Sequence, residues 1–197
     1  KSHDLEIISQ MIDIVKLSNE KLLILEICDL SIVNDIINTF GLLTEEKNKL
    51  IKLINFKSII DIERHLKDKG VSIKKINLIL DLVSLSGGIE IIPEIEKLLK
   101  ANRVKIDSKL SDLLYLAKKL KSTDKHLDVN VDMTNLSSLD YQSGLSFSLY
   151  VPSFRKSIAK GGRYNAYISE GKMRFASGFS LDLKDVYFLR KSGGKYV

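Results

Sequence analysis

The amino-acid sequence predicts an α+β protein whose β-sheet is interrupted along the chain by an all-helical segment. Three observations support this fold class. A short apolar run over residues 22–27 has the length of a buried strand rather than of a helix. Apolar residues then recur at helical spacing as far as residue 122, and after Lys125 they alternate with polar residues, as in a half-buried strand. The early strand is therefore expected to join the sheet formed after residue 127.

The first 30 residues form the start of the sheet-containing core. Apolar residues at helical spacing precede the strand of residues 22–27; they are Leu5, Ile8, Met11, Ile12 and Val15. Because such a stripe buries one side of a helix, one helix followed by one buried strand is expected here. The whole chain of 197 residues has room for one medium domain, or for a small domain with a sizeable insertion, since a domain averages roughly 150 residues.

Residues 31–122 read as the helical insertion. Residues that favour helix N-caps recur at Ser31, Thr44, Ser58 and Ser72. Gly41 and Gly70 mark helix ends, and Pro93 suits a first helical turn. The clearest internal break is Gly87-Gly88. Two apolar stripes define helices and supply core: Ile73, Ile76, Leu80 and Val83, then Ile106, Leu110, Leu113, Leu114, Ala117 and Leu120.

Residues 123–197 return to strand patterns. One alternating run is Leu127, Val129, Val131 and Met133, and another is Leu145, Phe147, Leu149 and Val151. A further strand is expected near residues 157–159, after the turn at Pro152-Ser153. Residues 175–180 then read as a strand that leads into a short helix over residues 181–189. A β-meander is the simplest arrangement of these strands.

Composition excludes several classes of protein. The chain is 44% hydrophobic and 28% charged, with no apolar stretch near the ~18 residues of a membrane span. Its start shows no signal peptide, and because it does not begin with Met the native start is expected to be missing or removed. The single cysteine, Cys28, permits no intrachain disulfide and no cysteine-based zinc site. A cytoplasmic protein with a buried Cys28 is expected.

The net charge of +6 is unevenly distributed. Residues 141–197 contain ten Lys or Arg and three acids, whereas residues 1–140 contain 21 and 22. This asymmetry is compatible with an anionic partner for the last segment, such as a phosphorylated ligand, an acidic protein surface or nucleic acid. Compositional drift in a sequence rich in lysine and isoleucine explains it equally well.

The sequence lacks residues that metal-binding and nucleotide-binding motifs require. Asp128, Asn130 and Asp132 imitate the opening of a calcium loop, but Met133 and Leu139 occupy the positions where glycine and glutamate are needed. A solvated strand face explains the three polar residues better. His65 has acids one helical turn away on either side, which is typical of an exposed charged helix. No phosphate loop or dinucleotide fingerprint occurs, so neither a metal nor a cofactor is expected.

Residues 159–164 contain the one segment that favours ligand binding. Its paired glycines, Gly161 and Gly162, let backbone N–H groups approach a ligand, and Arg163 can hold a carboxylate or phosphate through two hydrogen bonds. A glycine turn beside a surface arginine is the alternative explanation.

Three short motifs occur in an informative order. They read Leu-Asp-Tyr-Gln-Ser-Gly over residues 139–144, Gly-Gly-Arg-Tyr-Asn over residues 161–165 and Gly-Phe-Ser-Leu-Asp-Leu over residues 178–183. In this order they resemble the class II histidyl-tRNA synthetase fold, whose motifs have the forms Arg-Gly-Leu-Asp-Tyr-Tyr-Thr-Gly, Gly-Gly-Gly-Arg-Tyr-Asp and Gly-Phe-Ala-x-Gly-x-Glu-Arg. The resemblance implies a partial class II synthetase-like antiparallel sheet with a helical insertion.

Two positions depart from the synthetase motifs. Ser137 stands where the first motif has an arginine that stabilises the activated carboxylate, and Asp185 aligns with the arginine that holds ATP phosphate. A hydroxyl and a carboxylate cannot supply those contacts, because the second would repel phosphate. No counterpart of the first two class II motifs or of an anticodon-binding domain is seen in the chain. The resemblance therefore implies a catalytically disabled relative.

Among such relatives, the sequence is similar to the regulatory subunits of ATP phosphoribosyltransferase, whose third motif has the form Gly-Phe-x-Leu-Asp-Leu. This resemblance implies a non-catalytic protein of the first step of histidine biosynthesis. Its implied partners are a short-form catalytic subunit, a second copy of itself and histidine. The residues that would remain from a histidine pocket are Tyr141, Gly144, Gly161, Gly162, Arg163 and Tyr164.

Two other functions stay open at this level. The chain could be a fragment of a genuine histidyl-tRNA synthetase, which predicts histidine-dependent adenylate chemistry. It could also be a basic nucleic-acid-binding module, since aromatic residues such as Tyr150 and Tyr164 lie among the cations of its last segment. We rank this third function last, because most of those aromatics alternate along strands and are better explained by packing.

Overall fold

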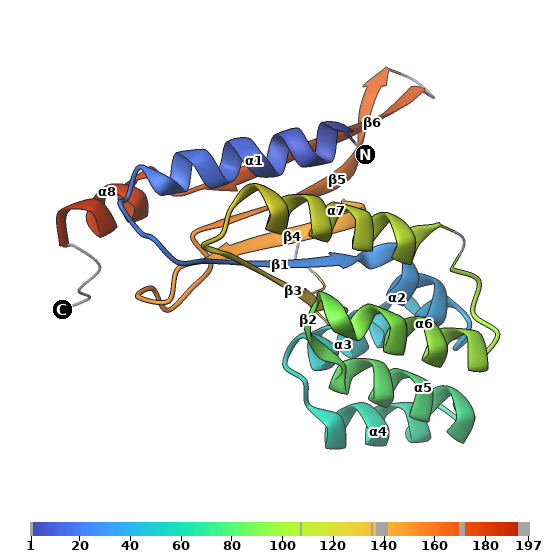
Figure 1. Ribbon diagram of the computed structural model, residues 1–197. Helices are drawn as coiled ribbons and strands as arrows, with labels where there is room; N and C mark the ends of the chain where they lie inside the picture. Colours follow the sequence, from blue (N-terminus) through green and yellow to red (C-terminus); the bar gives the residue numbers. More distant parts are fainter. Residues whose placement is uncertain (1, 107, 135, 137–141, 170–171, 193–197) are drawn as a thin grey trace.

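Six strands pair into one sheet in the computed structural model, which describes residues 2–106, 108–134, 136, 142–169 and 172–192 (Figure 1). The order across the sheet is β2-β3-β1-β4-β5-β6. The strands are β1 Leu23–Asp29, β2 Ser86–Gly88, β3 Leu127–Asp132, β4 Gln142–Tyr150, β5 Ala159–Ser169 and β6 Lys172–Leu181.

The early strand β1 lies inside the sheet. It pairs in parallel with β3, from Leu23 opposite Leu127 to Ile27 opposite Val131, and antiparallel with β4. The other pairings, β2 with β3, β4 with β5 and β5 with β6, are antiparallel. The predicted α+β class and the late meander are confirmed. The sheet is mixed rather than wholly antiparallel, because the chain returns from β1 to β3 through a long helical crossover.

Two helices cover one face of the sheet. They are α1 Ser2–Lys16, which packs on β6, and α7 Lys109–Thr123, which packs on β1 and β3; the two helices also contact each other, and both lie above the sheet in Figure 1. The stripe predicted for the first helix is confirmed, since Ile8, Met11, Ile12 and Val15 are buried. A last helix, α8 Leu183–Ser192, follows β6 directly.

The remaining helices lie between β1 and α7 in sequence. They are α2 Leu30–Asn38, α3 Thr44–Asn55, α4 Ile59–Asp68, α5 Ile73–Ser84, a short 3₁₀ turn Ile89–Ile91 and α6 Ile92–Ala101. Figure 1 shows α3 to α6 stacked away from α1. This segment is not wholly helical, because the predicted break at Gly87-Gly88 is the edge strand β2, which pairs with Val131 and Asn130 of β3.

Helix boundaries agree in part with the cap predictions. Ser58 and Ser72 are N-caps as predicted, and Gly41 and Gly70 adopt the positive φ angles expected at helix ends, 72° and 69°. The predicted N-caps at Ser31 and Thr44 were wrong, since these residues lie inside α2 and α3. Asp29 caps α2 instead, because its carboxylate accepts a hydrogen bond from the Ser31 backbone N–H at 3.0 Å.

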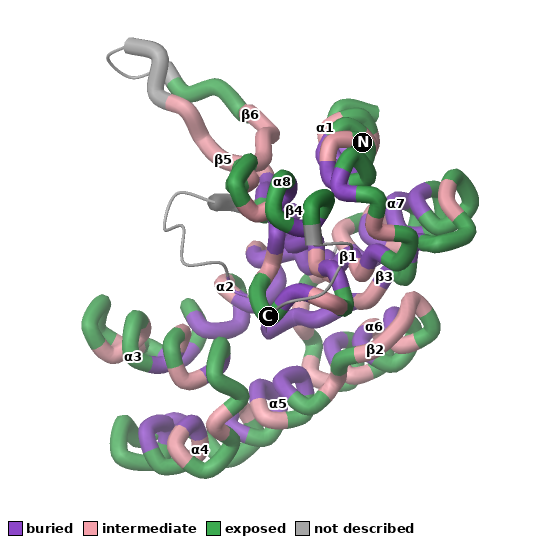
Figure 2. Tube along the Cα trace, turned by 90° about the vertical axis from the view of Figure 1, so that its left-hand side faces the viewer, coloured by how far each residue is buried: buried purple, intermediate pink, exposed green. Residues whose placement is uncertain are grey.

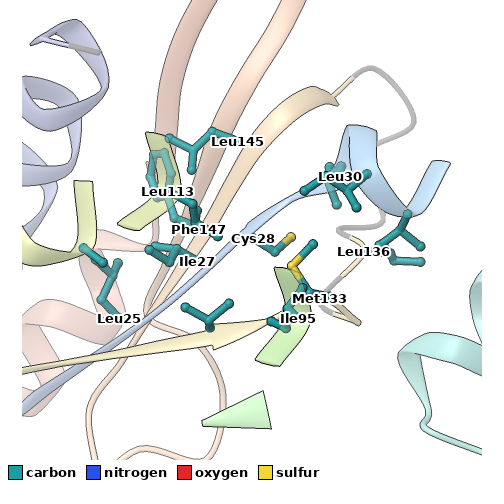
Figure 3. Close-up of a cluster of buried hydrophobic side chains, with 14 of the residues drawn as sticks. Leu25, Ile27, Cys28, Leu30, Ile95, Leu113, Met133, Leu136, Leu145 and Phe147 are labelled. Carbon is teal, nitrogen blue, oxygen red and sulfur yellow. The ribbon is translucent and has the colours of Figure 1, made fainter. Parts of the chain in front are cut away.

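The core follows the central strands. Buried residues are concentrated along β1, β3 and β4 and on the helix sides that face them (Figure 2). Figure 3 shows Leu113 of α7 beside Ile27, Leu145 and Phe147, which come from the sheet. Phe147 is almost fully buried at the centre of this cluster. The sheet is thereby held rigidly beneath α1 and α7, which line the site described next.

Candidate functional site

The predicted pocket residues lie on both faces of the sheet. Successive residues of a strand point to opposite faces, so Arg163 of β5 projects toward α1, whereas Gly162 and Tyr164 face the other side. Tyr164 lies against Gly178 of β6 on that side. Tyr141 and Ser137 fall outside the described residues. The described members of the predicted set therefore do not converge on a single pocket.

Arg163 is held by an acid that sequence reasoning missed. Its guanidinium donates two hydrogen bonds to the carboxylate of Asp4 on α1, Nε to Oδ1 at 3.0 Å and Nη2 to Oδ2 at 2.6 Å. Ser177 of β6 donates a third hydrogen bond to Asp4 Oδ1 at 3.0 Å. Asp4 is only 4% exposed. This cluster ties α1 to the two last strands of the sheet.

Electrostatics make the Asp4–Arg163 contact a true ion pair. Burial alone would raise the pKa of Asp4, but the hydrogen bonds and charge of Arg163, aided by Ser177, lower that pKa below its usual range. The pKa of Arg163 is raised in return, first by the hydrogen bond to Asp4 and further by the charges of Asp29 and Asp112. Both groups stay charged, and the guanidinium that was predicted to hold a ligand is already bound to a carboxylate.

Two glycines of the predicted set have different roles. Gly144 adopts a φ of 99° at an irregularity in β4, and a Cβ there would lie 3.8 Å from Arg163 Cδ. Gly161 is required by packing, because a Cβ at that position would come within 2.4 Å of both the Gly178 carbonyl oxygen and the Phe147 ring. Gly144 thus borders the space around Arg163, whereas Gly161 lets Phe147 pack closely on β5.

A cavity of about 410 Å³ opens beside Arg163. Its walls come from α1, the start of α2, α7 and strands β4 to β6. The lining residues are Asp4, Asp29, Ser31, Ser108, Lys109, Asp112, Leu113, Tyr115, Leu116, Gly144, Leu145, Arg163, Asn165 and Phe175. Of the predicted site residues that the structure describes, Gly144 and Arg163 are among them and Gly161, Gly162 and Tyr164 are not. No sequence signal linked Asp4, Asp29 and Asp112 to this place, because they lie far apart in the chain.

Asp185, the predicted replacement of the third-motif arginine, takes part in an ion pair. Asp185, in the first turn of α8, lies 2.8 Å from Lys156 Nζ. Asp182 accepts a hydrogen bond from the Lys184 backbone N–H at 2.8 Å and so caps the same helix end. Two carboxylates, those of Asp182 and Asp185, therefore stand at the start of α8.

Metal-ligating and nucleophilic side chains do not converge within the described residues, where no group of three His, Cys, Asp or Glu is placed to hold a metal. The predicted solvated face of β3 was wrong for Asp132, which is buried and lies 2.8 Å from Lys57 Nζ. The expected exposed His65 was also wrong: its ring is buried, with Nε2 3.0 Å from the Glu46 carbonyl oxygen. Cys28 is buried as expected, and burial raises the pKa of its thiol, so it is no nucleophile.

Comparisons with known proteins place the chain among synthetases and their relatives. A family model described as histidyl-tRNA synthetase matches residues 1–186. A curated protein of Marinobacter nauticus, an "ATP phosphoribosyltransferase regulatory subunit", is 29% identical over 96% of this chain and 50% of its own length. The chain thus spans about half the length of the curated relatives it matches.

Solved structures show the same fold. A protein of Bacillus halodurans, called an ATP phosphoribosyltransferase regulatory subunit/histidyl-tRNA synthetase, matches with a TM-score of 0.73 at 22% identity, over 97% of this chain and 49% of that one. An ATP phosphoribosyl transferase (HisG:HisZ) complex from Thermotoga maritima matches with a TM-score of 0.64 at 21% identity, over 90% and 60%. The class II synthetase-like fold is therefore confirmed. Of the helices described, none has the length and apolar character needed to cross a membrane.

Proposed function

Because the chain belongs to the histidyl-tRNA synthetase family, we propose that within this family it serves as a non-catalytic regulatory subunit of ATP phosphoribosyltransferase, at the first step of L-histidine biosynthesis. One observation carries this proposal. Curated relatives that are 27–29% identical over 92–100% of the chain bear the name of that regulatory subunit. A cytoplasmic location is part of the proposal, and the buried Cys28, which forms no disulfide, suits a reducing compartment.

Loss of synthetase chemistry is the second part of the proposal. Ser137 and Asp185 replace the two arginines that would neutralise the activated carboxylate and the ATP phosphates. The carboxylate of Asp185 already pairs with Lys156, and Asp182 lies in the same helix cap. A phosphate brought to this helix end would meet two carboxylates in place of one guanidinium, which disfavours binding of ATP in the synthetase manner.

Partners form the third part. The proposed partners are a short-form catalytic subunit and a second copy of the chain, with histidine as the feedback ligand. The name of the Thermotoga maritima complex supports a partner subunit for a protein of this fold. Exposed apolar side chains on β6 and α8, among them Phe175, Leu183 and Tyr187, support association with another polypeptide through this end of the sheet.

Reconstitution tests the regulatory function. The protein is mixed with a short-form ATP phosphoribosyltransferase catalytic subunit, and both binding by calorimetry and the rate of the transferase reaction are measured with and without histidine. We expect complex formation, a higher rate and inhibition by histidine. The absence of both binding and any rate effect contradicts the proposal.

Two matched variants test the proposed contact surface. Leu183→Asp places a charge on the start of α8, whereas Leu43→Asp places one at the start of α3, and both leucines are 71% exposed. We expect Leu183→Asp to weaken association with the catalytic subunit or with a second copy, and Leu43→Asp to leave both unchanged. Equal effects of the two variants would refute the assignment of this surface.

A fragment of a true histidyl-tRNA synthetase is the second candidate, favoured by the description of the matching family model. It predicts histidine-dependent exchange of pyrophosphate into ATP, which the regulatory function does not. We expect no exchange. Exchange that requires histidine would establish the synthetase instead.

A further inference from the structure

A second cavity lies within the helical segment, between α2, the start of α5 and the residues that follow α6. Its volume of about 580 Å³ falls within the range of ~300–1,000 Å³ typical of ligand pockets. The lining residues are Asp35, Ile36, Thr39, Ser72, Lys74, Lys75, Leu78, Asn102, Arg103, Val104 and Lys105. None of them lines the cavity beside Arg163, so the two cavities are separate.

Positive charge predominates on the wall of this second cavity. Four of its lining residues are cations, namely Lys74, Lys75, Arg103 and Lys105. Asp35 is the one acid among them, and its carboxylate lies 2.7 Å from Nζ of Lys109, which neutralises it from outside the lining. Within the described residues, no carboxylate contacts any of the four cations. Because like charges held together repel one another, an anion in the cavity would be attracted by all four.

Arg103 is brought to the cavity by the turn that ends α6. The Val104 backbone N–H donates to the Leu99 carbonyl oxygen at 3.0 Å, and the Arg103 N–H donates to the Lys100 carbonyl oxygen at 3.0 Å. These two hydrogen bonds form a Schellman motif, in which glycine is usual at the position that Arg103 occupies with a φ of 57°. The turn thus fixes the backbone of a lining arginine, and a guanidinium can donate to two oxygens of one phosphate.

The first turn of α5 supplies two of the four cations, Lys74 and Lys75, which follow Ile73 at the start of the helix. Lys75 Nζ donates a hydrogen bond to the Thr39 carbonyl oxygen at the end of α2. A carbonyl oxygen holds the ammonium group in place but does not cancel its charge. The helix dipole adds a partial positive charge at the same end of α5, so it reinforces the attraction for an anion.

The floor of the cavity is apolar. Ile36 of α2 and Leu78 of α5 are buried, and Val104 is half-buried. Ligand pockets typically combine such apolar walls with a few polar groups that fix the orientation of the ligand. The cavity therefore suits a small molecule that has an apolar or ring-shaped frame at one end and a negative charge at the other.

We propose that this cavity binds a compact organic phosphate. Its phosphoryl oxygens accept hydrogen bonds from Lys74, Arg103 and Lys105, while its frame packs on Ile36 and Leu78. A phosphate dianion matches several cations better than a carboxylate does, because it has more charge and more acceptor oxygens. The proposal goes beyond the regulatory function, since it concerns a site on the chain alone. Binding here with no effect on a catalytic subunit, or the reverse, separates the two.

A matched pair of probes tests the role of the phosphate. The protein with ¹³C-labelled isoleucine and leucine methyl groups is titrated with phenyl phosphate and with benzyl alcohol, which has a similar ring and no charge. We expect saturable shifts of the Ile36 and Leu78 methyl signals with phenyl phosphate, weakened by added salt, and no saturation with the alcohol. Equal response to both probes overturns the proposal. So does a response of these signals to an RNA oligonucleotide but not to phenyl phosphate, which would assign the cations to a nucleic acid.

Variants test the cations themselves. Lys74→Gln and Arg103→Gln each remove one charge from an exposed residue, so the fold should be retained. We expect each to weaken binding of phenyl phosphate by about fivefold, the effect of one solvent-accessible ion pair. The control is Lys52→Gln, since Lys52 is exposed on α3 and outside the cavity, and it should bind like the parent. Unchanged affinity in both cavity variants, or an equal loss in the control, contradicts the proposal.

Discussion

Two contacts between distant segments, one buried and one exposed, join a carboxylate to a cation. Asp4 on α1 contacts Arg163 on β5 and is almost fully buried, whereas Glu46 on α3 lies 2.7 Å from Lys69 after α4, and the side chains of Glu46 and Lys69 are 22% and 39% exposed. Both carboxylates have pKa values below their usual range. For Glu46 the lowering of the pKa comes first from the Lys69 hydrogen bond and then from the Leu43 backbone N–H. The same direction of pKa shift thus arises in two very different environments.

The difference shows where an ion pair matters to the fold. Removing one partner of a buried pair leaves a charge without water or counter-ion, while the partner of an exposed pair is hydrated at once. Helix α1 is attached to the sheet by such a buried pair, whereas α3 and α4 are joined by apolar packing around Leu50, Ile54 and Ile62. The following predictions separate these two kinds of attachment.

The largest loss of folding stability is expected for Arg163→Ala. It removes both guanidinium hydrogen bonds from the buried Asp4 carboxylate, which still accepts the hydrogen bond of the Ser177 hydroxyl. We expect the free energy of unfolding to fall by about 3 kcal/mol, the lower end for a broken buried pair, because the Arg163 side chain is itself 38% exposed. Urea denaturation measures this. A loss no greater than that of an exposed pair would mean that α1 is attached mainly by apolar contacts.

The next largest loss of stability is expected for Gly161→Ala, at the first glycine of the Gly-Gly-Arg-Tyr-Asn motif. The new methyl group would lie 2.4 Å from both the Gly178 carbonyl oxygen and the Phe147 ring, so we expect a loss of about 2 kcal/mol from overpacking. The matched control is Gly178→Ala, whose methyl group would meet only Tyr164 at 3.7 Å. Thermal unfolding compares the two variants. Equal stability would contradict the packing role of Gly161.

A smaller, pH-dependent effect is expected for Asp4→Asn. The variant should lose about 1–2 kcal/mol at neutral pH, the contribution of hydrogen bonds to a charged group. The folded-state pKa of Asp4 is lowered, so its stabilisation is complete above the unfolded pKa, near 3.8, and is lost as the pH falls through the folded value. The free energies of unfolding of parent and variant should therefore become equal at low pH. Denaturation of both proteins from pH 7 down to pH 2 tests this. A difference in the free energy of unfolding that does not change with pH would rule out the ion pair as the cause.

The smallest effect is expected for Lys69→Ala. The Lys69–Glu46 contact is open to solvent, so the melting temperature should stay within the error of the measurement, and salt should abolish any residual change. Thermal melts at low and high ionic strength provide the comparison with Arg163→Ala. A loss as large as that of Arg163→Ala, insensitive to salt, would remove the distinction between the two contacts.

Local patterns predicted most elements of the fold. The stripe of α1, the strand near residues 22–27 and the alternation of β3 and β4 all follow from the repeat of side-chain directions within one element, 3.6 residues in a helix and two in a strand. Errors arose where a neighbour decides exposure. His65 and Asp132 are polar residues on patterned elements, but α3 covers the first and Lys57 neutralises the second.

The candidate site could be predicted only in part. Glycine and arginine motifs directed attention to β5, and Gly144 with Arg163 do border a cavity. The same motif placed Tyr164 and Arg163 together, although adjacent residues of a strand face opposite sides of the sheet. Asp4, Asp29 and Asp112 carry most of the negative charge of the cavity, and nothing in their local sequence distinguishes them from ordinary helix-terminal acids.

The sequence by itself determined the α+β class, the order of helices and strands and the class II synthetase-like layout, because these depend on periodicity and on motif order along the chain. Only the tertiary structure decided that Asp4 meets Arg163 across 159 residues, that Gly87-Gly88 adds an edge strand, and that the predicted pocket divides between two faces. The physical reason is that backbone geometry fixes local direction, whereas contacts between distant residues depend on how the strands of the sheet are ordered and which helices cover each face.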